Sequence, residues 1–236
     1  MQEYFVDEPL EPGQIIELPK EKAFHAFRVL KLNHETVRLV SHNTGYFAEV
    51  YTEQGKGLAR ILSVDDAVNE LPVPFTLCMA LIRREKFELV LQKATELGVS
   101  RIVPFVSSRC VVKAKDEKKD RQKERWNAIV TEASEQCKRN CIPEVLHPLA
   151  FHELAGFHEE VSLAAYEGVR LSAASVSRSM KRAPVCGVIG PEGGFSEEEV
   201  SYLEAHGFTP VSLGNRILRA ETAAIYLCAA VGEAFL

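Results

Sequence analysis

From about residue 74 onward, short apolar runs alternate with longer amphipathic stretches. Each apolar run has the length of a buried strand, and turn-forming residues bound it. The pattern predicts strands at Phe75–Ala80, Arg101–Phe105, Ser162–Tyr166, Val185–Ile189 and Thr209–Leu213. Helices are predicted at Arg84–Leu97, around Asp120–Lys138, at Glu197–His206, and over a final apolar segment that includes Ala223–Val231. Strands and helices in alternation are typical of an α/β domain with a parallel sheet.

The first 70 residues follow a different pattern, with strand-like runs separated by turn signals. Strands are predicted at Gln14–Leu18, Thr36–Val40, Tyr46–Tyr51 and Leu58–Val64, and one helix at Lys20–Leu30. This arrangement predicts a small β-barrel. Pro72 and Pro74 mark the join, so we expect two domains, residues 1–70 and 74–236.

The last predicted helix has no charged residue in Ala223–Val231. A helix that is apolar all round is buried. It is too short to span a membrane, so we expect it to pack inside the fold or at a subunit interface.

Two glycine-bearing loops near the C-terminus each lie between a predicted strand and a predicted helix. In the first, VCGVIGPEGGFSEEEV, the apolar run ends at Ile189. Ser196 and Glu199, three residues apart, form the pattern of a capping box. The second, VSLGNRILRAETAAIYLCAAV, turns at Gly214–Asn215. Because the carboxyl ends of parallel strands share one edge of a sheet, the two loops predict a single small-molecule pocket.

The first loop matches neither common fingerprint of a nucleotide-phosphate site. Glu192 precedes the predicted helix and Glu197–Glu199 open it, so carboxylates stand where a phosphate would bind. The expected ligand therefore lacks phosphates and carries positive charge, as S-adenosylmethionine does. A purely structural strand-to-helix turn is the alternative for this loop taken alone.

Composition places few further limits on function. The chain has 236 residues, 46% of them hydrophobic, with a net charge of −5. Residues 1–73 contain seven Lys and Arg residues and 12 Asp and Glu residues. This excess of negative charge argues against a broad phosphate-binding surface there. Local basic clusters occur at Arg83–Lys86, Lys113–Arg125, Lys138–Arg139 and Lys181–Arg182. Each is either an RNA-backbone contact or a solvated surface.

The six cysteines lie mostly in apolar segments and are expected to be reduced. Cys137 and Cys141 are one helical turn apart and His147 follows, but without a second matching pair we expect no metal site. The start, MQEYFVDEPLEPG, does not resemble a signal peptide, and no apolar run reaches the roughly 18 residues of a membrane span. A soluble, cytoplasmic protein with no membrane partner is predicted.

The two loops and several other segments resemble the ribosomal RNA small subunit methyltransferase E family of SPOUT (trefoil-knot) methyltransferases. The matching segments are Lys86, Leu91–Val99, Arg109–Lys113, Glu132–Arg139, Gly190–Phe195, Leu213–Gly214 and Arg216–Ala224. The resemblance implies an S-adenosylmethionine-dependent methyltransferase acting on N3 of a uridine in 16S rRNA, within an assembled small ribosomal subunit. It also implies a trefoil-knot domain with a parallel sheet, preceded by a PUA-like β-barrel that binds RNA, and a homodimer.

Methyl transfer to N3 requires loss of the N3 proton and stabilisation of the resulting negative charge. We expect Arg219 and Arg216 to stabilise that charge, because a guanidinium offers several donors and stays charged. Glu221 is the nearest carboxylate that could accept a proton or orient an arginine; a first-turn glutamate serving the helix dipole is the alternative. The expected cofactor-binding residues are Tyr166, Gly190, Glu192, Gly193, Gly194, Leu213, Gly214 and Leu218. The end of the strand at Ala165–Glu167 is expected to provide a third cofactor loop. For Tyr166 within it, ordinary core packing is the alternative.

Two positions depart from the family pattern. Lys31 stands where the family has arginine, and the turn glycine that follows is absent, which argues against RNA contact there. Ala220 stands where the family often has threonine. Two other functions stay open: a SPOUT methyltransferase with another RNA target (ribose 2′-OH or tRNA), and a non-catalytic RNA-binding ribosome-assembly protein.

Overall fold

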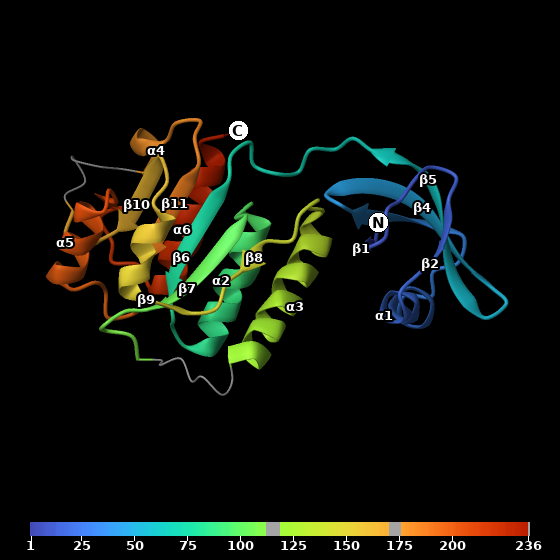
Figure 1. Ribbon diagram of the computed structural model, residues 1–236, viewed down its shortest axis with the longest axis horizontal. Helices are drawn as coiled ribbons and strands as arrows, with labels where there is room; N and C mark the ends of the chain where they lie inside the picture. The colour runs from blue at the N-terminus through green and yellow to red at the C-terminus, as the bar shows by residue number, and fades with distance from the viewer. Residues whose placement is uncertain (112–118, 170–175, 236) are drawn as a thin grey trace. The chain divides into compact units, whose positions relative to one another are not determined.

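The computed structural model describes residues 1–111, 119–169 and 176–235. The chain divides into two compact units (Figure 1). One comprises Met1–Glu70 together with Ser134–Cys141, and the other comprises Leu71–Ala133 with Ile142–Leu236. The sequence pattern did not anticipate that eight residues from the middle of the chain group with the N-terminal unit.

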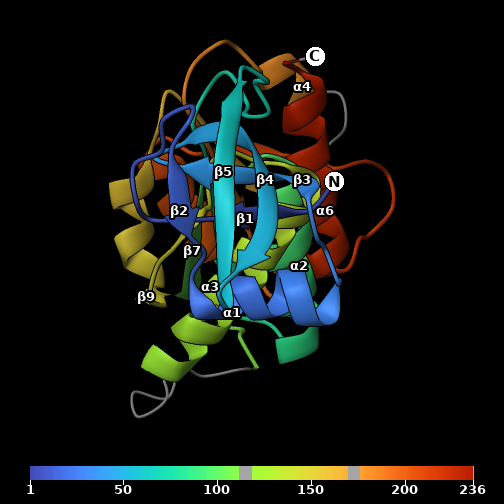
Figure 2. The same cartoon turned by 90° about the vertical axis from the view of Figure 1, so that its right-hand side faces the viewer.

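The first unit contains a mixed five-stranded sheet in the order β1-β3-β4-β5-β2. Its strands are β1 (Glu3–Phe5), β2 (Ile15–Glu17), β3 (Glu35–Ser41), β4 (Thr44–Glu53) and β5 (Lys56–Asp65). β1 runs parallel to β3, and the other pairs are antiparallel. Figure 2 shows β2, β5 and β4 side by side. The predicted strands are all present, whereas the three-residue β1 was missed.

One helical segment crosses this sheet: α1 (Lys20–Phe24) continues into a π-helical turn, η1 (His25–Val29). It packs against the start of β5, where a Cβ at Gly57 would lie 2.5 Å from the ring of Phe27. Just after it, Lys31 and His34 adopt left-handed φ values of 57° and 55°. These two residues make the turn without the glycine that the family pattern would supply.

The second unit is an α/β domain with a parallel seven-stranded sheet, as predicted. Six strands follow the order β12-β10-β11-β6-β7-β8, and β9 also pairs with β7. The strands are β6 (Phe75–Ala80), β7 (Arg101–Val106), β8 (Glu144–Val145), β9 (Leu149–Ala150), β10 (Val161–Ala165), β11 (Val185–Ile189) and β12 (Thr209–Val211). All of their pairings are parallel. β12 ends at Val211, two residues before its predicted end.

Helices cover both faces of this sheet, because side chains of its central strands alternate between two apolar clusters. Phe75, Leu77 and Met79 of β6 belong to one cluster, and Cys78 and Ala80 belong to the other. The first cluster is closed by α2 (Arg84–Glu96), α3 (Lys119–Cys137), α4 (Val176–Ser179) and α6 (Ala220–Glu233). The second is closed by η3 (Phe151–Phe157) and α5 (Glu197–Ala205).

α6 packs tightly on β11, since a Cβ at Gly187 would lie 2.6 Å from Leu227 Cδ2. The expectation that this helix is buried holds for one face only: Leu227, Cys228 and Val231 are buried, whereas Tyr226 is half exposed. In the described ranges, no helix is long and apolar enough to cross a membrane.

Candidate functional site

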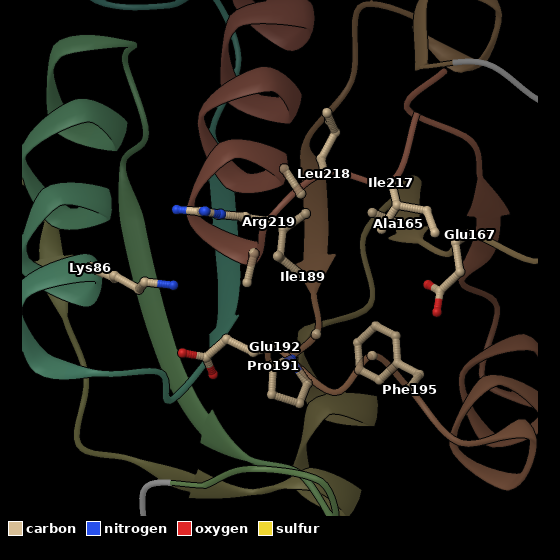
Figure 3. A pocket seen from close by; sticks show the side chains of 14 residues that line it. Lys86, Ala165, Glu167, Ile189, Pro191, Glu192, Phe195, Ile217, Leu218 and Arg219 are labelled. Atoms are coloured by element: carbon tan, nitrogen blue, oxygen red, sulfur yellow. The ribbon is translucent and has the colours of Figure 1, made fainter. Parts of the chain in front are cut away.

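A pocket of about 360 Å³ lies at the carboxyl ends of β10 and β11, beside the N-terminus of α6 (Figure 3). This volume is within the range of small-molecule sites. Its lining residues are Lys86, Ala165, Glu167, Ile189, Gly190, Pro191, Glu192, Gly194, Phe195, Ile217, Leu218, Arg219, Ala220 and Ala223. The pocket therefore lies where the two glycine-bearing loops predicted it.

The first loop forms one wall of the pocket. β11 ends at Ile189, and a turn follows in which Gly194 N donates to Pro191 O at 2.9 Å. Gly194 has a φ of 66°, and a Cβ there would lie 2.8 Å from Glu167 Oε1. Glycine is required at this position for both backbone conformation and space.

The loop ends at a capping box, as predicted. Ser196 Oγ accepts from Glu199 N at 3.2 Å, and Glu199 Oε2 accepts from Ser196 N at 3.0 Å. Glu199 also accepts from Ser108 N at 2.8 Å and from Ser107 Oγ at 3.3 Å. Burial by itself would raise the pKa of Glu199, but these hydrogen bonds outweigh it and the pKa is lowered.

Arg109 holds the same loop from outside the pocket. Its Nη1 donates to Gly193 O and to Phe195 O, both at 3.2 Å. A Cβ at Gly193 would lie 3.1 Å from Arg109 Cβ, so Gly193 is close to this arginine and is not among the lining residues. The loop's conformation therefore depends on residues 107–109, which belong to another part of the chain.

The second loop forms the opposite wall. Gly214 adopts a φ of 114°, and its N–H donates to Ser212 Oγ at 3.3 Å. The chain then passes through Ile217, which is 90% exposed although it lines the pocket, and reaches Arg219, the N-cap of α6.

Charged groups gather at two ends of the pocket. Figure 3 shows Lys86, Glu192 and Arg219 at one end, and Glu167 beside Phe195 and Ile217 at the other. The ammonium of Lys86 and the carboxylate of Glu192 point toward one another. The Lys86 Nζ also lies 3.3 Å from Oε1 of Glu221, which is 9% exposed and does not line the pocket.

The structure brings only some of the sequence-predicted site residues into the pocket wall. Gly190, Glu192, Gly194, Leu218 and Arg219 line it. The other predicted residues do not line it: Tyr166, Gly193, Leu213, Gly214, Arg216 and Glu221. Tyr166 packs against the apolar cluster under η3 and α5, and Arg216 is exposed.

Sequence reasoning missed Lys86 as a candidate for the site. The end of the predicted strand at Ala165–Glu167 was expected to provide a third cofactor loop, and Ala165 and Glu167 line the pocket. Lys86 stands in a segment that carries the family resemblance, and Glu167 follows the predicted strand that ends at Tyr166. The sequence therefore carried a signal at both positions. Nothing in the sequence pattern alone shows that the first turn of α2 reaches the carboxyl end of β11.

Several members of the predicted basic clusters form ion pairs instead of standing free. Arg125 makes two hydrogen bonds to Glu88, at 2.6 and 2.7 Å. Arg139 is 2% exposed, and its Nη2 donates to Glu70 Oε2 at 2.6 Å, which rules out an RNA contact by this residue. Residues 113–118 of the Lys113–Arg125 cluster lie outside the described residues. Across the described ranges, no three His, Cys, Asp or Glu side chains gather as a metal-binding group.

Comparison with known proteins identifies matches over nearly the whole chain. The model of the RNA methyltransferase domain family matches residues 69–232. The ribosomal RNA small subunit methyltransferase E of Bacillus subtilis (strain 168) is 30% identical, over 98% of this chain and 96% of that protein.

Two solved structures are similar in both sequence and fold. One is a ribosomal RNA small subunit methyltransferase E from Neisseria gonorrhoeae bound to S-adenosyl methionine: 30% identity, 98% and 96% coverage, TM-score 0.86. The other is a methyltransferase from Legionella pneumophila in complex with the same cofactor: 34% identity, 98% and 97% coverage, TM-score 0.87.

Proposed function

The chain belongs to the ribosomal RNA small subunit methyltransferase E family, and on this basis we propose that it methylates N3 of a uridine in 16S rRNA. It is an S-adenosylmethionine-dependent RNA methyltransferase. The choice of N3 and of a uridine follows from what the family resemblance implies.

The pocket at the carboxyl ends of β10 and β11 carries this proposal, because its walls fit the cofactor. Gly190 and Gly194 line the pocket, and their lack of a side chain leaves room for Phe195 and Glu167, since a Cβ would lie 3.1 Å from Phe195 or 2.8 Å from Glu167. The lining carboxylates, Glu167 and Glu192, suit a ligand with positive charge and hydroxyl groups and without phosphates. Ile189, Leu218 and Ala223 supply apolar surface for an aromatic ring.

The chemistry requires one group supplied by the cofactor and several supplied by the chain. Bound S-adenosylmethionine supplies an electrophilic methyl group. Uridine N3 is protonated at neutral pH, so this chain must orient the base and stabilise the negative charge left when the proton departs to water. Arg219 lines the pocket and offers a permanently charged guanidinium for the carbonyl oxygens of the base.

The other predicted roles stand as parts of the same proposal. Gly190, Glu192, Gly193, Gly194, Leu213, Gly214, Leu218 and Tyr166 form or support the cofactor loops. Arg216, exposed on the second loop, is available to the RNA. Glu221, which was expected to accept a proton or orient an arginine, is buried and pairs with Lys86, so its proposed role is to hold that lysine.

The finer architecture is also proposed from the family. The parallel-sheet domain is a SPOUT trefoil-knot domain, and the mixed five-stranded sheet is a PUA-like barrel that binds RNA. The enzyme acts as a homodimer in the cytoplasm on an assembled small ribosomal subunit. Tyr226, half exposed in the uncharged middle of α6, supports a subunit contact at that helix.

The experiment that tests the function is methyl transfer from labelled S-adenosylmethionine to small ribosomal subunits that lack the modification. Nucleoside mass spectrometry of the product is expected to show 3-methyluridine. Fully modified subunits are the matched negative control. A 2′-O-methylated nucleoside, or methylation of tRNA in place of the subunit, would contradict the N3 assignment. Cofactor binding without any product would mean that the assayed RNA is not the substrate, and no cofactor binding at all would favour the non-catalytic alternative.

A further inference from the structure

Lys86 is a pocket residue that comes from outside the two glycine-bearing loops. It lies in the first turn of α2, and its side chain is 31% exposed. Figure 3 shows its ammonium pointing into the pocket, between the carboxylate of Glu192 and the guanidinium of Arg219. A lysine in this position can donate hydrogen bonds to a ligand.

Glu221 contacts this lysine and is largely shielded from water. It occupies the first turn of α6 and is 9% exposed. Its Oε1 lies 3.3 Å from Lys86 Nζ, and its Oε2 has no hydrogen-bond partner among the described residues. Burial of a carboxylate with one oxygen unpaired opposes folding unless a nearby positive charge compensates it.

A role in the helix dipole alone does not account for this arrangement. A glutamate in a first turn interacts favourably with the dipole without needing to be buried. The first turn of α5 illustrates this, since Glu197 and Glu198 lie there exposed. The buried carboxylate of Glu221 is distinguished by its contact with Lys86, whose ammonium it holds at the pocket.

The geometry leaves part of the ammonium free for a ligand. A lysine ammonium has three donor hydrogens, and the single contact with Glu221 Oε1 at 3.3 Å uses at most one of them. Glu192 and Arg219 lie beside it, so this end of the pocket holds both negative and positive side chains. Such a site suits a ligand with both a positive and a negative group, or one that develops negative charge next to a cation.

We infer that Lys86 binds a negatively charged oxygen of a ligand in this pocket, and that Glu221 is the residue that positions it. The inference rests on the proposed function, because two sources of such an oxygen enter a methyltransferase site. One is the α-carboxylate of S-adenosylmethionine. The other is a carbonyl oxygen of uracil after N3 has lost its proton.

The bond changes are balanced in either case. The N3 proton leaves to water, and the nitrogen electron pair forms the new N–CH₃ bond as the S–CH₃ bond breaks and leaves its electron pair on sulfur. Lys86 keeps its proton throughout. Its contribution is electrostatic: it either fixes the cofactor or lowers the energy of the ionised base.

The test compares Lys86→Met, Lys86→Arg and Glu221→Gln with a control on the same helix, Lys93→Met. Lys93 pairs with Glu96 at 2.8 Å and does not line the pocket. For each variant, calorimetry gives the Kd of S-adenosylmethionine and of its decarboxylated analogue. Turnover on unmodified small subunits is then measured as a function of pH.

Two outcomes support the inference and identify the source of the oxygen. If the source is the cofactor carboxylate, Lys86→Met raises the Kd of S-adenosylmethionine by roughly 10- to 100-fold and leaves that of the decarboxylated analogue unchanged. If the source is uracil, the Kd is unchanged, and kcat falls by roughly 10- to 100-fold with a deficit that shrinks as pH rises. In either case Lys86→Arg retains more function than Lys86→Met, and Glu221→Gln shows a smaller loss of the same kind.

Other outcomes overturn it. If the Kd and kcat of Lys86→Met stay within about twofold of the wild-type values, Lys86 does not bind a ligand in this pocket. The inference also fails if Lys86→Met weakens the binding of S-adenosylmethionine and of its decarboxylated analogue equally and both Lys86→Met and Lys86→Arg lower the Tm. The binding measurement needs no RNA, so it is independent of the proposed function. If the wild type makes no methylated RNA, an unchanged Kd in Lys86→Met overturns the inference and a selectively raised Kd sustains it.

Discussion

The carboxylate of Glu199 accepts a hydrogen bond from the backbone N–H of Ser108 at 2.8 Å. Glu199 lies in the first turn of α5, and Ser108 follows β7 on a distant part of the chain. The same carboxylate closes the capping box with Ser196 directly after the GPEGGF loop. One side chain therefore fixes both the start of α5 and the position of the GPEGGF loop relative to Ser107 and Ser108.

The first prediction concerns the pH dependence of stability. The folded-state pKa of Glu199 is lowered from 4.5, so the carboxylate stabilises the fold fully above that value, and this stabilisation is lost as pH falls through the lowered pKa. Glu199→Gln is expected to cost about 1–2 kcal/mol at pH 7. Its Tm should approach that of the wild type as the pH falls from 6 toward about 3. A constant Tm difference over this range would contradict the assignment.

The second prediction concerns a buried arginine in the first unit. Arg38 is 2% exposed and donates to Glu3 at 2.7 Å, to Asp65 at 2.6 Å and to Asn140. Arg38→Met leaves the fully buried Glu3 without its counter-charge, so the free energy of unfolding is expected to fall by about 3–5 kcal/mol. Urea denaturation measures this loss.

A double variant separates the pair from general packing. Arg38→Met with Glu3→Gln removes the uncompensated charge and should recover part of the stability lost in Arg38→Met alone. Additive losses from the two substitutions would show that the ion pair does not account for the effect.

The sequence predicted those elements whose signals are local. β6 and β11 are short apolar runs that each follow a proline, and both appear at their predicted residues. The start of α5 followed from Ser196 and Glu199, three residues apart. In contrast, β8 and β9 have two residues each and exist only because β7 pairs with them, so no local pattern marks them.

The site was predicted in part for the same reason. Glycines that the chain needs at sharp turns, such as Gly194, can be recognised from sequence. The direction in which a loop residue faces depends on tertiary contacts: Gly193 faces Arg109, and Glu221 faces Lys86. Both partners come from segments far away in the sequence. Periodicity and spacing carry no information about such pairs.

The third prediction concerns Gly194, where both the backbone conformation and the available space favour glycine. Gly194→Ala places a Cβ 2.8 Å from Glu167 Oε1 and forces alanine into a left-handed conformation. We expect a stability loss of about 1–2 kcal/mol and a weaker affinity for S-adenosylmethionine, measured by thermal denaturation and calorimetry. Gly156→Ala, where a Cβ meets nothing within 4 Å, is the matched control. Unchanged cofactor affinity in Gly194→Ala would place the cofactor away from this loop.

The last prediction tests the division of roles between the two arginines of the second loop. Arg219 lines the pocket, whereas Arg216 is exposed outside it. Arg219→Ala is expected to lower kcat by roughly 10²- to 10³-fold while the Kd of S-adenosylmethionine stays within a few-fold of wild type, because the guanidinium acts on charge that develops in the uracil. Arg216→Ala should instead raise the KM for the ribosomal subunit, with a steeper loss as salt increases. Equal losses of cofactor affinity and turnover in Arg219→Ala would mean that Arg219 shapes the pocket and does not stabilise the reacting base.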